Sequence, residues 1–298
     1  MPIVDPLWPR ADTWLAMDSP DPSLLVVGVP SSKASLSPTR ADLAPLLMRE
    51  RLHRFSTFHG ERSVDFGGLQ VWDVGNWPVS ELDMHALPEA LVRHATDLPD
   101  AELVLYLGGD NAITRPLVMA RGDDLTKVGV LTFDAHHDVR SLVNGPTNGT
   151  PIRGLIEENG LPGRNVAQIG IHSFANSAAY RSYCEEQGVT VFTVEEVEKR
   201  GMEAVIYEAF RALEHCDSIY VDVDVDVLDR SFAPGCPGAR PGGLTVRQLS
   251  EGVWWSALRP KVTAFDFVEV DPELDHEAQT LDVMAHLFLT AAAGYAGR

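Results

Sequence analysis

A short acidic motif with two adjacent histidines follows an apolar run near the middle of the chain. The segment LTFDAHHDVR (131–140) contains Asp134, His136 and Asp138 at alternate positions. In an extended backbone alternate side chains share a face, so these three can point at one place while His137 points elsewhere. Two carboxylates and one imidazole on one side suit a divalent transition metal, and a solvated acidic loop is an equally good interpretation of this segment alone.

A second acidic run, VDVDVDVLD (221–229), strengthens the metal interpretation. It places Asp222, Asp224, Asp226 and Asp229 among valines and a leucine. Carboxylates that crowd a buried strand repel one another unless a cation lies between them. The alternative is a solvated edge strand, but edge strands favour lysine and mixed charge. Two carboxylate-rich strand ends indicate a two-metal centre, in which bridging carboxylates hold the ions close together.

The elements around these motifs alternate between strands and helices. Apolar, β-rich runs span residues 23–30, 102–110, 127–138, 166–173, 189–194, 218–229 and 262–272, and helical patterns span 88–98, 177–188, 202–216 and 245–258. This alternation predicts a parallel sheet covered by helices on both faces. Such sheets bind ligands beyond the carboxyl ends of their strands, where both acidic motifs lie. The turn GGDNAIT (108–114) marks a third strand end of this kind.

The composition of the chain argues against some classes of binding partner. The chain has 298 residues, of which 45% are hydrophobic, and we expect one α/β domain over residues 1–298. A net charge of −19 repels phosphate backbones and anionic lipid, so we expect neither a nucleic-acid nor a membrane partner. The cysteines Cys184, Cys216 and Cys236 are odd in number and unrelated in spacing, which fits a reducing cytoplasm.

The order of the motifs resembles one enzyme superfamily. GGD, then DAHxD, then DxDxxD followed by APG and GG, is similar to the ureohydrolases: arginase, agmatinase, guanidinobutyrase and formimidoylglutamase. The resemblance runs from GVPSS (28–32) to FVEVDP (267–272). It implies a three-layer α/β/α sandwich with a mainly parallel central sheet. It also implies two Mn²⁺ ions at the strand ends and hydrolysis of a C–N bond in a guanidino compound or amidine.

The resemblance assigns metal ligands by position. Asp134 and Asp224 would bridge both ions, His136 and Asp226 would complete one ion, and Asp138 would bind the other. Water between the ions would be the nucleophile, because bound metal lowers its pKa toward neutrality.

Two further carboxylates receive roles from the same resemblance. Asp229 would orient the ligands from behind. Glu269 matches the family's acidic residue that holds the cationic group of the substrate beside the metals, and a solvated loop carboxylate is the alternative. With Asp134 and Asp224, Glu269 completes the predicted catalytic set.

The sequence departs from the family at two positions. Asn111 stands where the family usually has a metal-binding histidine, and an amide oxygen is a weaker ligand than an imidazole nitrogen. We therefore expect the ion near Asn111 and Asp138 to be held more weakly, or to be another divalent metal. Asn148 stands where arginases and agmatinases carry a histidine thought to shuttle protons.

Arginines near the motifs favour one branch of the family. DAHHDVR followed by NGTPIR resembles formimidoylglutamase, and Arg140 and Arg153 could bind the carboxylates of its substrate, because guanidinium groups match carboxylates in bidentate fashion. Neutralisation of neighbouring aspartates is the alternative. With Asn148 and Glu269, these arginines are the predicted substrate-binding residues.

Three functions follow from these expectations. The first is conversion of N-formimidoyl-glutamate to glutamate and formamide. An agmatinase or guanidinobutyrase that releases urea is the second. A metal-poor relative that binds a ligand without turnover represents a different class. A homo-oligomer is possible, since members of the family commonly form trimers or hexamers.

Overall fold

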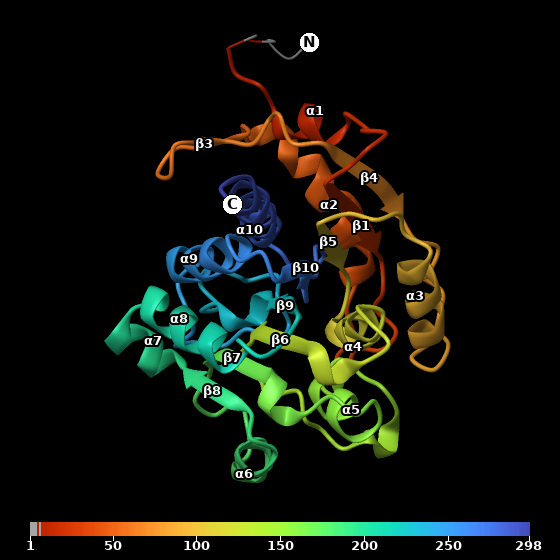
Figure 1. Ribbon diagram of the computed structural model, residues 1–298, viewed down its shortest axis with the longest axis vertical. Helices are drawn as coiled ribbons and strands as arrows, with labels where there is room; N and C mark the ends of the chain where they lie inside the picture. The colour runs from red at the N-terminus through yellow and green to blue at the C-terminus, as the bar shows by residue number, and fades with distance from the viewer. Residues whose placement is uncertain (1–4, 6) are drawn as a thin grey trace.

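The computed structural model describes residue 5 and residues 7–298, and it is built around one eight-stranded sheet (Figure 1). The strand order is β4-β1-β5-β10-β9-β6-β7-β8, and each neighbouring pair described is parallel. The strands are β1 (Leu24–Val29), β4 (Val71–Asn76), β5 (Leu103–Gly108), β6 (Val128–Phe133), β7 (Val166–Ile171), β8 (Thr190–Thr193), β9 (Ser218–Asp224) and β10 (Val262–Val268). A small antiparallel hairpin, β2 (Phe58–His59) and β3 (Val64–Asp65), stands apart from this sheet.

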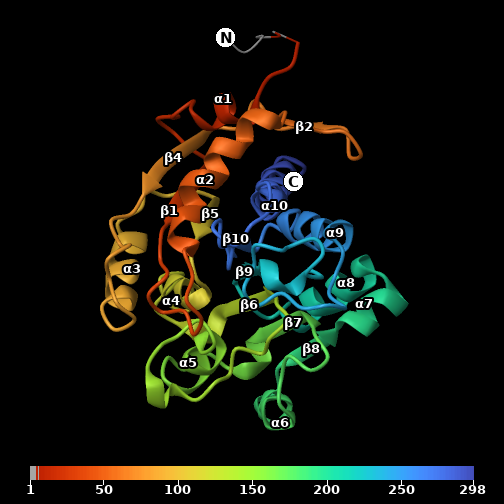
Figure 2. The same cartoon turned by 180° about the vertical axis from the view of Figure 1, so that it is seen from behind.

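Helices cover both faces of the sheet, as Figures 1 and 2 show from opposite sides. Alternate residues of β1 point to opposite faces: Leu24 and Val26 enter one hydrophobic cluster, and Leu25 and Val27 enter the other. The first cluster is closed by α1 (Ala11–Leu15), α2 (Ala44–Arg51), α7 (Val194–Arg200), α8 (Met202–Ala212), α9 (Val246–Ala257) and α10 (Gln279–Ala296). The second is closed by α3 (Leu87–Thr96), α4 (Thr114–Met119), α5 (Pro151–Glu157) and α6 (Ala178–Gln187). The predicted three-layer α/β/α sandwich is thus confirmed.

The acidic motifs follow strands that are neighbours in the centre of the sheet. β5, β10, β9 and β6 lie side by side and run in the same direction, so their carboxyl ends meet at one edge. The turn after β5 needs glycine, because a Cβ atom on Gly109 would lie 1.8 Å from the backbone oxygen of Ser31. This close approach packs the loop after β1 against the loop after β5.

The backbone around the acidic motifs differs from the expected extended strands. β6 ends at Phe133, and Asp134 to Asp138 form a loop in which Asp138 has a φ of 53°. β9 ends at Asp224 and turns into the short 3-10 helix Val225–Val227. The prediction of strands through Asp138 and Asp229 was therefore wrong, because the chain turns over the end of the sheet. These turns, not strand alternation, direct the acidic side chains inward.

Two further observations bear on the expected environment. Among the described residues, no helix is both long enough and apolar enough to span a bilayer. The three cysteines are buried and form no disulfide in the described structure.

Candidate metal centre

A small pocket opens at the carboxyl ends of the central strands. Its volume is about 140 Å³, and several of the residues selected from the sequence line it: His136, Asp138, Arg140, Asn148, Asp224, Asp226 and Glu269. Asp134 lies next to these lining residues, since its Oδ1 accepts a hydrogen bond of 2.6 Å from the backbone N–H of His136. Loops that follow β6, β9 and β10 therefore bring these side chains to one place.

Asp134, His136 and Asp226 form the tightest group. One potential ligand atom from each lies within 4.8 Å of the others. His136 Nδ1 lies 2.8 Å from Asp226 Oδ2 and 3.5 Å from Asp134 Oδ1. The neighbouring Asp226 carboxylate, with Asp134, raises the pKa of His136 to about 12. Asp226 also accepts a hydrogen bond from the Ala135 backbone, which fixes its second oxygen.

The other carboxylates are buried close to this group. Burial and the charges of Asp226 and Asp134 raise the pKa of Asp224 well above its ordinary value. Burial and the charge of Asp134 do the same for Asp138. Four buried carboxylates around one imidazole carry more negative charge than the surrounding side chains balance. Hard oxygen donors with one nitrogen are a donor set that suits Mn²⁺ and related divalent ions, so these residues fit a site for divalent metal.

Asn111 lies at the edge of this cluster, immediately after β5. Its Nδ2 donates a hydrogen bond of 2.7 Å to Asp138 Oδ2, and its Oδ1 accepts one of 2.6 Å from the Thr114 hydroxyl. In this arrangement the amide nitrogen, not the oxygen, faces Asp138. Asn111 thus donates a hydrogen bond to a predicted ligand, and its own role as a metal ligand stays a prediction.

Glu269 is held above the cluster by two amides. Its Oε1 accepts hydrogen bonds from the Asn111 backbone N–H at 2.8 Å and from Asn148 Nδ2 at 3.0 Å. Asn148 Oδ1 in turn accepts from the Leu36 backbone N–H, which ties the loop after β1 to the pocket. Burial, with the nearby Asp110, raises the pKa of Glu269 to about 8. The carboxyl group is fixed in position, and it points into the pocket that the metal ligands line.

Four of the selected residues are not part of the pocket lining: Asn111 and Asp134, which contact the lining residues as described above, and Arg153 and Asp229. Arg153 donates Nε to the Val139 backbone oxygen at 2.8 Å, pairs with Glu157 at 3.5 Å and stacks over Tyr183 at 4.1 Å. Asp229 accepts from the Ser231 hydroxyl at 2.6 Å and from the Gly242 backbone N–H at 2.6 Å. Its hydrogen bonds organise the loop after β9, so it does not orient the ligands directly as we expected.

Several residues that line the pocket were not selected from the sequence, among them the polar residues Asn176, Tyr180 and Arg240. Arg240 lies in the glycine- and proline-rich loop after β9. A loop that follows a ligand-bearing strand must pass the site, and that topological signal could have identified it. The loop is held close, because a Cβ atom on Gly238 would lie only 2.2 Å from Asp226 Oδ2.

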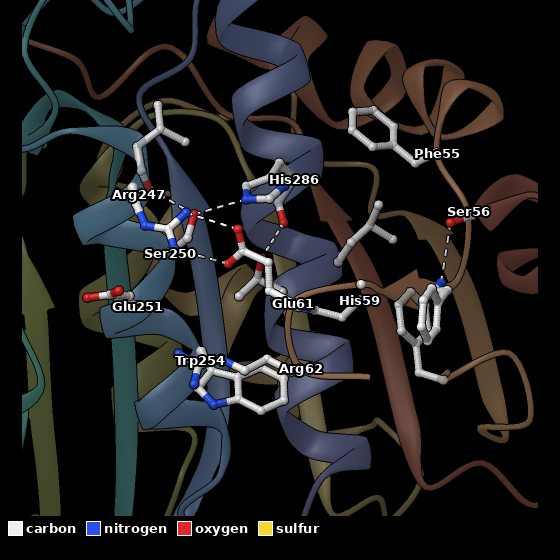
Figure 3. A pocket seen from close by; sticks show the side chains of 16 residues that line it. Phe55, Ser56, His59, Glu61, Arg62, Arg247, Ser250, Glu251, Trp254 and His286 are labelled. Atoms are coloured by element: carbon white, nitrogen blue, oxygen red, sulfur yellow. Dashed lines mark hydrogen bonds and ion pairs between the residues drawn. The ribbon is translucent and has the colours of Figure 1, made fainter. Parts of the chain in front are cut away.

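A larger cavity, of about 450 Å³, lies between the β2–β3 hairpin and helices α9 and α10 (Figure 3). Figure 3 shows Glu61 facing Arg247 and His286 facing Ser250, in agreement with hydrogen bonds of 2.9 and 3.0 Å. Among the described residues, the one convergent group of metal-ligating side chains is at the strand ends and not in this cavity. We therefore place the candidate site at the strand ends.

The chain is similar to known proteins over most of its length. The arginase family model matches residues 22–294. Formimidoylglutamase from Halalkalibacterium halodurans is 39% identical over 90% of this chain and 86% of that protein. Guanidinopropionase from Pseudomonas aeruginosa is 34% identical over 73% of this chain and 69% of that protein.

Solved structures extend the comparison to the fold. Formimidoylglutamase from Bacillus subtilis has a TM-score of 0.90 and 34% identity, and the match covers 99% of this chain and 94% of that one. Trypanosoma cruzi formiminoglutamase, solved with Mn²⁺, has a TM-score of 0.88 at 24% identity, with 98% and 99% of the two chains covered, which is a likeness of fold. The chain belongs to the arginase family and is a hydrolase of C–N bonds in linear amidines.

Proposed function

We propose that this enzyme hydrolyses N-formimidoyl-glutamate to glutamate and formamide with two Mn²⁺ ions. The observation that carries the proposal is the 39% identity to a formimidoylglutamase over 90% of the chain, together with a pocket that both buried carboxylates and arginines line. A substrate with one cationic end and two carboxylates needs a site with both kinds of charge.

The buried cluster supplies the ligands for the ions. Asp134, His136, Asp224 and Asp226 would hold one or both of them, and Asp138 would complete the second. When bound, the ions supply a nucleophilic water near neutral pH, because they lower its pKa. The manganese in the Trypanosoma cruzi relative supports the choice of metal.

The chain's own side chains orient the amidine. Glu269, fixed by Asn111 and Asn148, would accept a hydrogen bond from the formimino nitrogen and stabilise its positive charge. Water adds to the amidine carbon, the C–N bond to the glutamate nitrogen breaks, and this nitrogen takes up a proton as it leaves. Asn148 would hold Glu269 and the loop after β1 in place. This role does not require the side chain at position 148 to transfer a proton.

A guanidino acid is the second candidate substrate, because a guanidinopropionase is 34% identical over 73% of this chain. Guanidinopropionate and guanidinobutyrate carry one carboxylate, and their hydrolysis would release urea. Agmatine carries no carboxylate, so an arginine at the pocket does not favour it.

A substrate panel tests the proposal. The protein, incubated with Mn²⁺, should release formamide from formimidoylglutamate with a kcat/KM far above that for urea release from guanidinopropionate, guanidinobutyrate, agmatine or arginine. Faster urea release from a guanidino acid would assign the enzyme to the second candidate. Metal analysis of the purified protein addresses the non-catalytic alternative, since two ions per chain are expected and a binding relative would hold none.

A further inference from the structure

Two arginines from different loops line the metal pocket. Arg140 follows the loop that carries Asp134 and Asp138, and Arg240 lies in the loop after β9. Both side chains are exposed, and the pocket between them also reaches Glu269. The pocket is therefore acidic at its base and has two guanidinium groups at its rim.

Each of these loops is held in place by defined contacts. The Arg140 N–H donates to the Gly149 backbone oxygen at 2.9 Å, and a Cβ atom on Gly149 would lie 2.6 Å from Arg140 Cδ. The Arg240 backbone oxygen accepts from the Arg230 N–H at 3.1 Å, and Asp229 accepts from the Gly242 N–H in the same loop. Both guanidinium groups are thus presented on ordered backbone.

Neither guanidinium group has a carboxylate partner within salt-bridge distance in the described part of the chain. Arg153 provides the contrast, since its guanidinium is taken up by Glu157, Tyr183 and the Val139 backbone. The Arg153 backbone N–H also donates to the Asp138 backbone oxygen at 3.3 Å. Arg153 therefore stabilises the ligand loop, and the uncompensated positive charge beside the pocket comes from Arg140 and Arg240.

We propose that Arg140 and Arg240 together bind the two carboxylates of the substrate, and that Arg240 makes the enzyme selective for amidines with two carboxylates. This inference rests on the proposed function, because it takes the amidine end to lie at the metals and Glu269. Both carboxylates of formimidoylglutamate lie on the side of the molecule away from the amidine carbon, so they face the rim of the pocket. Guanidinium groups pair with carboxylates in a planar, bidentate geometry, and two carboxylates need two such groups.

The test uses glutarate, a dicarboxylate with no amidine, as a binding probe. Calorimetry on the manganese-loaded protein should show that Arg240→Met and Arg240→Gln each weaken glutarate binding roughly 10- to 150-fold, the loss expected for a charge-assisted hydrogen bond. Binding of butyrate, which has one carboxylate, should change less than threefold. Arg93→Met, which removes an exposed arginine of α3 outside the pocket lining, should bind glutarate like the wild type.

Kinetics with formimidoylglutamate provides the second readout. Arg240→Met should raise KM by a similar factor with little change in kcat, because the arginine contacts the carboxylates and not the bond that breaks. Wild-type affinity for glutarate in both Arg240 variants, or equal losses for glutarate and butyrate, would overturn the inference. A wild-type protein that binds glutarate yet releases no formamide would overturn the proposed function and leave the dicarboxylate site standing.

Discussion

Asn111 and Asp138 are joined by a hydrogen bond of 2.7 Å from the amide Nδ2 to the carboxylate Oδ2. The Thr114 hydroxyl determines which end of the amide faces Asp138, because it lies 2.6 Å from Asn111 Oδ1 and 2.7 Å from Asp266 Oδ2. A hydroxyl group has one proton. When the Thr114 hydroxyl donates this proton to Asp266, its oxygen can accept a hydrogen bond from Asn111 Nδ2 after the amide has rotated. The amide oxygen of Asn111 then faces Asp138 and is available as a metal ligand.

The first prediction concerns the strength of the two metal sites. Mn²⁺ titration of the wild type should show two unequal sites, with the ion near Asn111 and Asp138 leaving first on dialysis against chelator, because an amide oxygen is the weakest donor in the set. Asn111→His should tighten this site, since imidazole nitrogen is a better ligand. Two equally tight sites in both proteins would show that Asn111 does not limit metal binding.

The second prediction concerns Glu269. Glu269→Gln keeps an oxygen that can accept from the Asn111 N–H and from Asn148, but it removes the negative charge. We expect kcat/KM for the amidine substrate to fall roughly 10- to 150-fold, the loss of one charge-assisted hydrogen bond. Glu273→Gln is the control, because this exposed glutamate pairs with Arg40 outside the pocket. Equal activities of the two variants would remove Glu269 from the mechanism.

The third prediction uses the close contact between Gly238 and Asp226. A methyl group at this position would lie 2.2 Å from Asp226 Oδ2, so Gly238→Ala must move either the loop or the carboxylate. We expect fewer manganese ions per chain after gel filtration, measured by elemental analysis. Gly68→Ala is the matched control, because no atom lies within 4 Å of its added Cβ. Full metal content in Gly238→Ala would show that the loop tolerates the shift.

The fourth prediction concerns the metal-free protein. Burial and neighbouring charges raise the pKa of Asp134 to about 6 and raise the pKa values of Asp138 and Asp224 well above their ordinary value. A carboxyl group with a raised pKa in the folded state favours folding at low pH, and this contribution is lost as pH rises through that pKa. Each pKa unit corresponds to about 1.4 kcal/mol, so the free energy of unfolding should fall by a few kcal/mol between pH 5 and pH 8.

Denaturant unfolding of the metal-free and manganese-loaded proteins at both pH values checks this prediction. Divalent ions compensate the carboxylate charges, so the loaded protein should lose much less stability over the same range. A metal-free protein that is equally stable at pH 5 and pH 8 would show that the carboxylates are not crowded in solution.

The strands that carry the site could be predicted because they are buried on both faces of the sheet, so their sequences are continuous runs of apolar residues. LVLYLG of β5 and VGVLTF of β6 are clear examples, and all their residues are buried. β4 was missed, since its sequence VWDVGN is partly exposed at the edge of the sheet. α10 was also missed: it is 18 residues long and buried on nearly all sides, so its sequence lacks the polar face that marks a surface helix.

Some residues of the site could also be predicted from the sequence, and others could not. Asp134, His136 and Asp138 were identified from their types and spacing, but their backbone is not an extended strand, because it turns through a positive φ at Asp138. Thr114 ends the GGDNAIT turn, and Arg240 lies in the loop that follows the second acidic run. The order of strands and loops places both segments near the site, but which of their side chains reach it depends on how these loops fold over the sheet.

The position of β10 has a consequence for how the chain folds as it is synthesised. β10 is the last strand along the described chain, yet it lies between β5 and β9 in the middle of the sheet. A nascent chain that ended before Val262 would leave β5 and β9 as two inner edges without a partner strand, and such edges can pair with another chain. Insertion of β10 pairs both inner edges and brings Glu269 to its place at the same time, so the active site becomes complete only when β5 and β9 are covered.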